Sequence, residues 1–459
     1  TVVSPKRSKT SIRILVGFCY PHKNHLGGPM LKTIVHPSVK LAGFIVALKL
    51  ALYQSQIKHL QQIADALIVC DQRKTLTNLY RQYVEELDPK TAADFFRESP
   101  WQAEDVGQPQ RKYMLLEYLR LRQMLDDEGP LVISIDDSLG KKYKDTRSLE
   151  AVAYHHDHNA STPYRQVYSN GYLYVESHVQ MGLLGFTFDT QVYLREKTIR
   201  QLNRKRQPGE RLRFRSKYRI ARAMLVEMAA ILPKGYPVYV TFDSWYASTK
   251  LIKFCRRQGW HVICALKSNR LLNGKSVKQH DQALKHWRYT QIRVRAADRS
   301  HSVRYFTRCL RGCIAKIREE VCVIISRRHP GSAYPKYFLS TDLSLSPQEA
   351  LNIYRMRWPV EVDNIYLKEA LGLGDFRLQS FEAIQKWFQV VLLALNYLQY
   401  QQALDYVQTG KYRILADFIR IHRTEHAQNV LRSVAKQVLA LGQIEPVLHC
   451  FIRADQSVT

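Results

Sequence analysis

Two short apolar segments that end in aspartate constrain the fold of this chain more than any other feature. Residues 131–137 read LVISIDD and residues 237–243 read PVYVTFD. Nearly continuous apolar runs of this length are typical of strands buried on both faces of a sheet. The stretches between and after them read in the order three strands, helix, strand, helix, strand. The pattern predicts a mixed α/β sheet covered by helices.

Carboxylates stand at the ends of both segments. Asp136 and Asp137 end the first predicted strand, and Asp243 ends the second. Mixed α/β sheets place catalytic groups beyond the carboxyl ends of their central strands. The sequence therefore predicts that Asp243 lies beside one of the two neighbouring aspartates, and it leaves open which one.

A third polar cluster lies in the C-terminal third of the chain. Ser346 is placed as a helix cap, with a proline at the next position and Glu349 completing a capping box. Four polar residues follow: Tyr354, Arg357, Glu361 and Lys368. At about 100° per residue they share one helix face, although Pro359 is expected to kink or restart the helix. The alternative is a row of exposed salt bridges.

A helix that crosses the same end of the sheet would bring Glu361 to the aspartates. Three converging carboxylates repel one another unless cations neutralise them, and hard oxygen ligands suit Mg²⁺ or Mn²⁺. Two such ions can promote attack on a phosphodiester and stabilise its leaving oxygen. Arg357 and Lys368 would then hold phosphates, and Tyr354 would bond a phosphate or stack on a base.

The charge balance indicates a polyanionic partner. The chain has 69 Lys and Arg against 40 Asp and Glu, a formal net charge of +29, which favours nucleic acid. Residues 199–219 are strongly basic and are expected to follow a DNA backbone, with a plain solvated surface as the alternative. No apolar run is long enough to span a bilayer, so no membrane partner is expected. Eight scattered cysteines indicate a reducing compartment.

The polar series of the third cluster matches the Y-(2)-R-(3)-E-(6)-K signature. On these residues the chain resembles bacterial insertion-sequence transposases of the Asp-Asp-Glu (DDE) type. The surroundings agree, with IDDS at the first strand end, VTFDSWY at the second and a β-rich stretch before the glutamate. The resemblance covers about 126–375. It implies an RNase H-like core that cuts DNA at transposon ends and joins the freed 3′-hydroxyl to target DNA.

The resemblance also implies which residues carry the chemistry. Asp137, Asp243 and Glu361 would be catalytic and would bind two Mg²⁺ or Mn²⁺ ions. Asp137 is favoured over Asp136 because the family often has an acid-Asp-Ser/Thr sequence at this point. The choice between the two stays open.

The DNA contacts are likewise implied by the resemblance. Tyr354, Arg357 and Lys368 would touch the transposon end near the cut, and Trp287 is a weaker candidate for bracing a flipped base. The partners would be double-stranded DNA, both terminal inverted repeats and target, and a second copy of the chain in a synaptic homodimer.

The predicted organisation has five parts. Residues 1–125 are helical, either a reader of DNA ends or a helical bundle, with 1–29 disordered or an upstream extension. Residues 126–270 and 336–375 form the RNase H-like core, the second part carrying the glutamate helix. Residues 271–335 are a β-rich insertion, and 376–459 a helical region opened by Ser380. The polar residues 98–112 read as a linker.

Two rival functions remain beside the transposase. A decayed or domesticated transposase would bind DNA at specific sites without cutting it. A nuclease without strand transfer would share the metal ions and release nicked products. For the transposase, the expected location is the bacterial cytoplasm, in association with the nucleoid.

Overall fold

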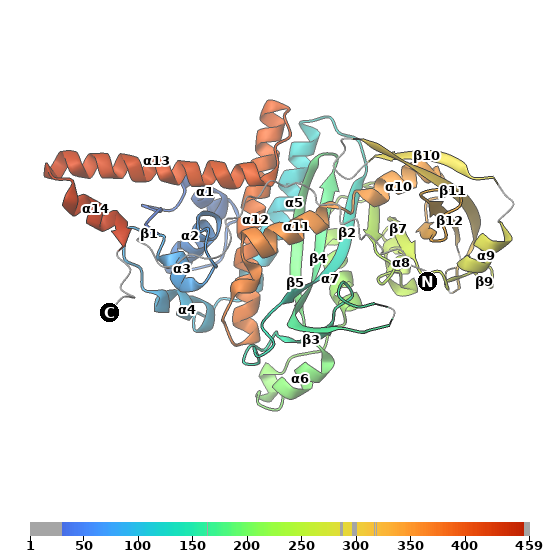
Figure 1. The fold of residues 1–459 in the computed structure, drawn as a ribbon, viewed down its shortest axis with the longest axis horizontal. Coiled ribbons are helices and arrows are strands. Elements are labelled where there is room, and N and C mark those ends of the chain that lie inside the picture. Colours follow the sequence, from blue (N-terminus) through green and yellow to red (C-terminus); the bar gives the residue numbers. More distant parts are fainter. Residues whose placement is uncertain are drawn as a thin grey trace, which may run out of the picture.

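The computed structural model describes residues 30–453, except 163, 285–287, 296–300, 316 and 318. Trp287 and the predicted extension 1–29 therefore lie outside the described residues. In the described part, a central sheet is flanked on one side by α12 and a group of helices, and a twisted β-rich part lies at the opposite end (Figure 1). Within these ranges, no helix is long and apolar enough to cross a bilayer.

The central sheet is mixed and has ten strands. Its strands are β2 (Leu131–Lys141), β3 (Ala153–His156), β4 (Tyr168–Met181), β5 (Leu184–Tyr193), β6 (Val238–Phe242), β7 (His261–Leu266), β10 (Thr290–Arg295), β11 (Ser302–Cys313), β12 (Glu320–Arg327) and β13 (Lys336–Ser340). Strands β2, β4 and β5 are antiparallel, and β6 and β7 continue from β2 in parallel. The order β5-β4-β2-β6-β7 is that of an RNase H-like core, which confirms the predicted fold class.

The β-rich stretch before the glutamate extends this sheet. Strand β13 pairs antiparallel with β7, and β12, β11 and β10 follow outward in turn. A small hairpin of β8 (Leu271–Leu272) and β9 (Lys275–Ser276) leads into α9 (Val277–Ala283). One continuous set of backbone hydrogen bonds therefore joins the core to this stretch.

Apart from α9, the helices fall into three groups along the chain. The group before β2 consists of α1 (Val39–Ala47), α2 (Gln54–Val69), α3 (Leu76–Tyr80), α4 (Pro89–Arg97) and α5 (Ala103–Gln123). The group between β5 and β7 consists of α6 (Glu196–Leu202), the 3₁₀ turn Pro208–Glu210, α7 (Lys217–Ile231) and α8 (Thr249–Arg257). The group after β13 consists of α10 (Pro347–Arg355), α11 (Pro359–Ile365), the π-helical turn Tyr366–Ala370, the 3₁₀ turn Leu373–Asp375, α12 (Phe381–Thr409), α13 (Leu415–Leu441) and α14 (Glu445–Phe451). Outside the sheet, β1 (Met30–Leu31) pairs with β14 (Ile452–Arg453).

Helix α12 joins the helical regions to the sheet. It begins where the Ser380 side chain accepts a hydrogen bond from the amide of Ala383, as the sequence predicts, and it ends at Gly410 with φ 67°. A left-handed residue at a helix end favours glycine. The helix packs against β5, α5 and α2, so it buries most of its length and ties the N-terminal helices to the core.

The predicted linker at 98–112 is wrong, because most of it forms the first turns of α5. The acid Asp105 accepts from the amide of Gln102 and so caps the helix start. Polar residues that read as a linker are buried and paired: Gln110 donates to Asn396 of α12 at 2.6 Å. A polar stretch can pack in a core when each group finds a partner.

Candidate active site

The aspartates lie side by side in the sheet. Strands β2 and β6 pair in parallel up to Ile135 opposite Phe242, so Asp136 and Asp243 follow directly at neighbouring positions. Strand β2 continues to Lys141, so its two aspartates lie within the strand and not at its end. The continuation is held by β4, which pairs with β2 along its whole length.

Arg357 connects the glutamate segment to the sheet. Its Nη1 donates to Asp136 Oδ2 at 2.5 Å, and its Nη2 donates to Glu361 Oε1 at 2.5 Å. The side chains of Arg357, Asp136 and Glu361 keep 15%, 21% and 38% of their exposure. The structure therefore brings Glu361 near Asp136 through a shared guanidinium that solvent can still reach.

Asp137 has a different neighbourhood. Its Oδ2 accepts from Nζ of Lys217, the first residue of α7, at 2.9 Å. The same Nζ lies 4.2 Å from the centre of the Trp245 ring, which stacks on Tyr218 at 4.4 Å. Neighbouring residues of a strand point to opposite faces. Of the two aspartates, Asp136 is the one that contacts the glutamate segment.

Asp243 shapes the turn that follows β6. Its Oδ1 accepts from the amides of Trp245 and Tyr246, at 2.9 and 3.2 Å. These two hydrogen bonds hold the Asp243 carboxylate at the end of β6 and fix the direction of the backbone in the turn that follows. Asp243 also acts on Asp136 electrostatically: burial and the nearby charge of Asp243 together raise the pKa of Asp136 to about 6, against the lowering effect of Arg357.

The four-residue series is not one helix. Helix α10 starts with the predicted cap, Ser346, bonded to Glu349, and ends at Arg355. Helix α11 starts at Pro359, and Lys368 lies in the π-helical turn. The proline removes a backbone donor and restarts the helix. The restart expected at Pro359 is therefore confirmed, and the four residues do not lie on one helix, although Arg357 and Glu361 still meet.

Two of the predicted DNA contacts are engaged inside the protein. Lys368 Nζ donates to Ser138 Oγ at 2.5 Å and to the Leu139 carbonyl at 3.0 Å. The ring of Tyr354 packs edge-on against Phe338 at 4.8 Å, and its burial raises its pKa to about 12. Tyr354 still lies beside Arg357, whose guanidinium is 5.9 Å from its ring centre, and Lys368 contacts β2 directly after Asp137. Both therefore border the acidic cluster, which consists of Asp136, Asp137, Asp243 and Glu361.

A fifth carboxylate, which was not predicted from the sequence, lies opposite Asp136. Glu176 of β4 pairs with Asp136 in register, is fully buried, and has no hydrogen-bond partner for Oε2 among the described residues. Burial raises its pKa well above the usual range, and Asp363 and Asp136 add to the rise. Its signal in the sequence was a single acid within the apolar strand YLYVESHV.

The carboxylates suit hard cations by chemistry. Asp136, Asp137, Asp243 and Glu361 offer oxygen ligands only, as Mg²⁺ and Mn²⁺ prefer. Their ligand atoms do not all lie within 4.8 Å of one another. In the described part of the chain, the one set of three acidic, histidine or cysteine side chains that meets this distance is Asp65, His422 and His426. Arg357 now supplies the positive charge between Asp136 and Glu361.

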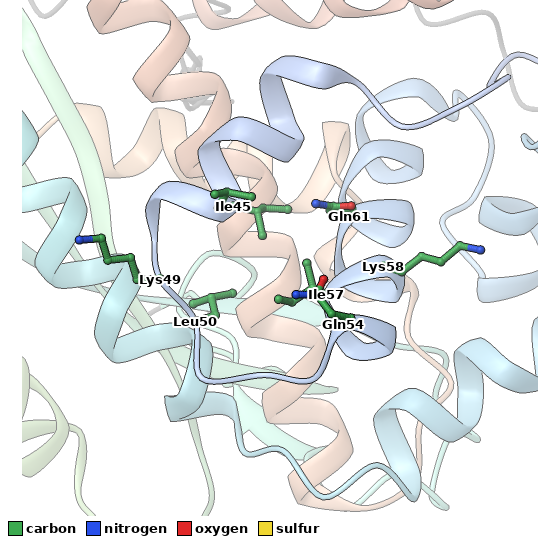
Figure 2. Close-up of a pocket in the computed structure, with 8 residues that line it drawn as sticks. Ile45, Lys49, Leu50, Gln54, Ile57, Lys58 and Gln61 are labelled. Carbon is green, nitrogen blue, oxygen red and sulfur yellow. The ribbon is translucent and has the colours of Figure 1, made fainter.

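A surface hollow lies elsewhere, between α1 and α2. It is lined by eight residues and contains none of the acidic side chains: Ile45, Val46, Lys49, Leu50, Gln54, Ile57, Lys58 and Gln61. Lys49 and Lys58 extend away from each other on its two sides (Figure 2). The candidate active site is therefore the acidic cluster at the sheet and not this hollow.

The chain matches two known families of proteins. Residues 51–301, more than half of the chain, match the family described as DDE superfamily endonuclease, and residues 215–397 match the family described as transposase DDE domain. The first range includes Asp136, Asp137 and Asp243, and the second includes Asp243 and Glu361. The chain matches no curated protein.

One solved structure is similar over most of the chain. It is the cryo-EM structure of the piggyBac transposase in its synaptic complex with hairpin DNA. The identity is 13%, the match covers 95% of this chain and 90% of that chain, and the TM-score is 0.45.

Proposed function

We propose, from the premise that this chain belongs to the DDE superfamily of endonucleases, that it is a transposase acting on the ends of its own DNA element. It would cleave phosphodiester bonds at those ends and join the freed 3′-hydroxyl to target DNA. The contact that carries the proposal is Arg357, which holds Glu361 against Asp136 of the sheet. Asp363 of α11 also bonds His178 and Thr187 on β4 and β5, so the glutamate segment is packed on the sheet beside the strand acids.

The residues have distinct roles in this proposal. Asp243, Glu361 and one of the neighbouring aspartates would hold two Mg²⁺ or Mn²⁺ ions, which would polarise the phosphodiester. Arg357 and Lys368 would hold the phosphate backbone of the DNA end, and Tyr354 would line it. Arg357 and Lys368 contact Asp136 and Ser138 of β2. A DNA strand bound to these two side chains would therefore lie along the acidic cluster.

The geometry favours Asp136 as the first carboxylate, whereas the acid-Asp-Ser pattern favours Asp137. Asp136 neighbours Asp243 and shares Arg357 with Glu361. Asp137 is paired with Lys217. We propose that Asp136 completes the metal site and that Asp137 holds Lys217 for contact with DNA.

The wider proposal follows the signature in the sequence. The Y-(2)-R-(3)-E-(6)-K spacing supports a bacterial insertion-sequence origin, and the net charge of +29 supports double-stranded DNA as partner. Two ends must be paired before joining, so we propose a homodimer in the synaptic complex and a location at the bacterial nucleoid.

A second candidate is a transposase that binds DNA without cutting it. It is favoured by one observation, the neutralisation of Asp136 and Glu361 by Arg357. In such a binding protein, Asp136 and Glu361 would serve as ion-pair partners of Arg357 and would not bind metal ions. Cleavage and binding assays on the same variants separate the two functions.

The decisive experiment combines the full chain, Mg²⁺ and labelled linear DNA that carries the element's ends. Asp243→Asn and Glu361→Gln should lower cleavage by about 10³-fold or more while DNA binding is kept. Asp136→Asn should do the same, and Asp137→Asn should weaken binding. The exposed Glu86→Gln is the matched control. Cleavage that survives in both Asp243→Asn and Glu361→Gln would refute this site, and absence of cleavage in the wild type would favour the binding protein.

A further inference from the structure

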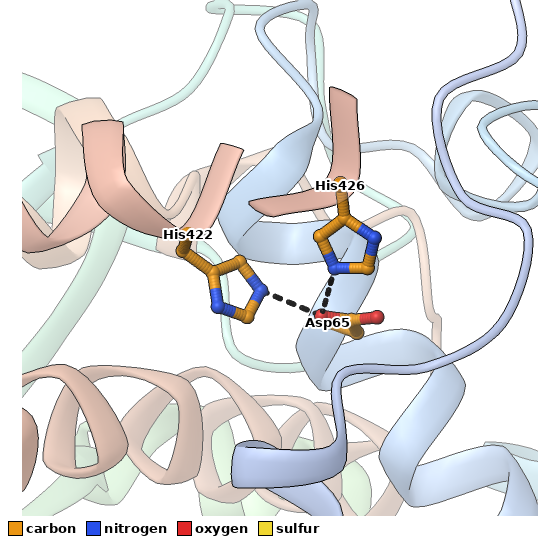
Figure 3. Close-up of side chains that lie close together, drawn as sticks. All are labelled: Asp65, His422 and His426. Carbon is orange, nitrogen blue, oxygen red and sulfur yellow. Dashed lines mark hydrogen bonds and ion pairs between the residues drawn. The ribbon is translucent and has the colours of Figure 1, made fainter. Parts of the chain in front are cut away.

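A buried cluster of polar side chains lies between helices α2 and α13, outside the acidic cluster of the sheet. Asp65 of α2 meets His422 and His426 of α13, and all three side chains are buried, at 0%, 3% and 2% exposure. His422 Nε2 lies 2.6 Å and His426 Nε2 3.0 Å from the same oxygen, Asp65 Oδ1 (Figure 3). Two imidazoles and one carboxylate therefore converge inside the helical region.

The local sequence explains the convergence. His422 and His426 are four residues apart on α13, so they lie one turn apart on the same face. That face packs against α2, and Asp65 stands at the contact. The other carboxylate oxygen of Asp65 accepts from the amide of Ser38, the cap of α1, at 3.1 Å. The carboxylate is thus fixed from one side and meets both imidazoles from the other.

The ligand atoms match the requirements of a transition metal. The three atoms lie within 4.8 Å of one another. A metal bonded to nitrogen and oxygen at about 2.0–2.2 Å would enter as the imidazoles move outward by less than about 1 Å from their present 2.6 and 3.0 Å contacts with Asp65 Oδ1. Imidazole nitrogen with a carboxylate suits Zn²⁺ better than Mg²⁺. A histidine pair one helical turn apart is a known zinc-binding arrangement.

We propose that Asp65, His422 and His426 form a structural site for one divalent transition metal, with Zn²⁺ as the expected ion. The site is sealed from solvent, so it would not take a substrate. The three side chains supply three ligands, and a water would complete a tetrahedral site. The ion would fasten α13 to α2, which joins the C-terminal helices to the N-terminal ones.

The rival explanation is a pair of hydrogen bonds to Asp65 without any ion. The Nδ1 atom of His426 is buried and has no hydrogen-bond partner among the described residues, so Nε2 is the ring nitrogen whose contact with Asp65 helps to orient it. A hydrogen bond and a metal bond at Nε2 would both give that orientation. The two explanations differ in whether stability depends on metal, which a measurement can decide.

The test uses the full chain stripped with EDTA and then titrated with Zn²⁺. We expect about one Zn²⁺ per chain to remain after gel filtration, and a rise in Tm with added Zn²⁺, because an ion that binds only the folded state stabilises it. Co²⁺ in its place should give the visible absorption of a tetrahedral site. A wild type that keeps no ion and whose Tm ignores Zn²⁺ would overturn the proposal, even if the variants below fail to fold.

Variants locate the ion. His422→Gln and His426→Gln should each lose the bound Zn²⁺ and the rise in Tm, whereas His449→Gln, an exposed histidine of α14, should keep both. Asp243→Asn should also keep both. Loss of the ion in Asp243→Asn, or its retention in His422→Gln and His426→Gln, would overturn the proposal. The result stands apart from the proposed function, since it does not require DNA cleavage.

Discussion

Two arginines in this molecule do the same electrostatic work in different surroundings. Arg111 of α5 pairs with Glu104 and with Glu227 of α7 at 2.7 Å, and it contacts Asp189 of β5 at 3.4 Å. Arg357 pairs with Asp136 and Glu361. Each guanidinium therefore joins carboxylates from separate elements, and each can form several directed hydrogen bonds.

The two arginines differ in their access to solvent. The Arg111 side chain is 3% exposed and its partner Asp189 is 2% exposed, whereas Arg357 is 15% and Glu361 is 38% exposed. The Arg111–Asp189 contact is sealed, although Glu104 at the rim of its network is exposed, so this contact can only hold elements together. In the solvent-accessible network, Asp136 and Glu361 can exchange Arg357 for a metal ion. This difference separates a structural network from a candidate site.

The largest stability effect is expected at the sealed network. Arg111→Met should lower the free energy of unfolding by about 3–5 kcal/mol, because it leaves buried Asp189 without its cation. Urea unfolding followed by circular dichroism measures the loss. A loss below about 1 kcal/mol would mean that water or a proton replaces the cation, and the contrast with Arg357 would fail.

Removing the open arginine should affect function more than stability. Arg357→Met should cost about 1–3 kcal/mol of unfolding free energy, less than Arg111→Met, because Glu361 can rehydrate whereas burial disfavours the charged form of Asp136. Its cleavage rate should fall about 10²-fold, because the group that positions DNA phosphate and Glu361 is gone. Cleavage assays and unfolding curves on the same preparation test both. If Arg357→Met destabilises as much as Arg111→Met, the two networks are alike.

A smaller change is expected at the edge of the acidic cluster. Lys368→Ala should weaken binding to DNA ends and reduce the slope of log affinity against log salt by about 1. Fluorescence anisotropy at several salt concentrations gives the slope, with exposed Lys411→Ala as the control. An unchanged slope would show that Lys368 only ties the π-helical turn to Ser138 and Leu139.

The smallest effect is expected at the exposed rim of the sealed network. The Glu104 side chain is 62% exposed, so Glu104→Gln should cost less than about 0.5 kcal/mol. Glu227→Gln, at 26% exposure, should cost more. Thermal unfolding of the two variants compares them directly, and equal losses would mean that exposure does not rank the partners of Arg111.

The sequence reading predicted what depends on local pattern. Strand and helix order in the core follow from apolar runs, and Ser346 and Ser380 cap their helices as their side chains allow. The burial of Gln110 and Arg111 was not predictable, because it depends on partners in α12, β5 and α7 that lie far along the chain. The same reason explains why the first turns of α5, residues 103–112, were predicted as part of a linker.

The candidate site shows the same division. Spacing along the chain predicted that Arg357 and Glu361 lie on the same side of their segment, and the meeting of both with Asp136 needed the packing of α11 on the sheet. The sequence did not resolve the choice between Asp136 and Asp137, since it depends on strand register and on where α7 places Lys217. Glu176 was not predicted as a site residue because one acid within an apolar strand has no evident role until its neighbour across the sheet, Asp136, is known.

The π-helical turn at Tyr366–Ala370 holds one residue more than an ordinary turn of helix. The wider turn absorbs the additional residue, so the chain leaves it in nearly the direction that a regular helix one residue shorter would give. A deletion in the regular helix α11 would instead rotate the residues after it by about 100° around the axis and carry Lys368 away from β2. The wide turn is thus the one place in this segment where a change of one codon can leave the groups on either side in position.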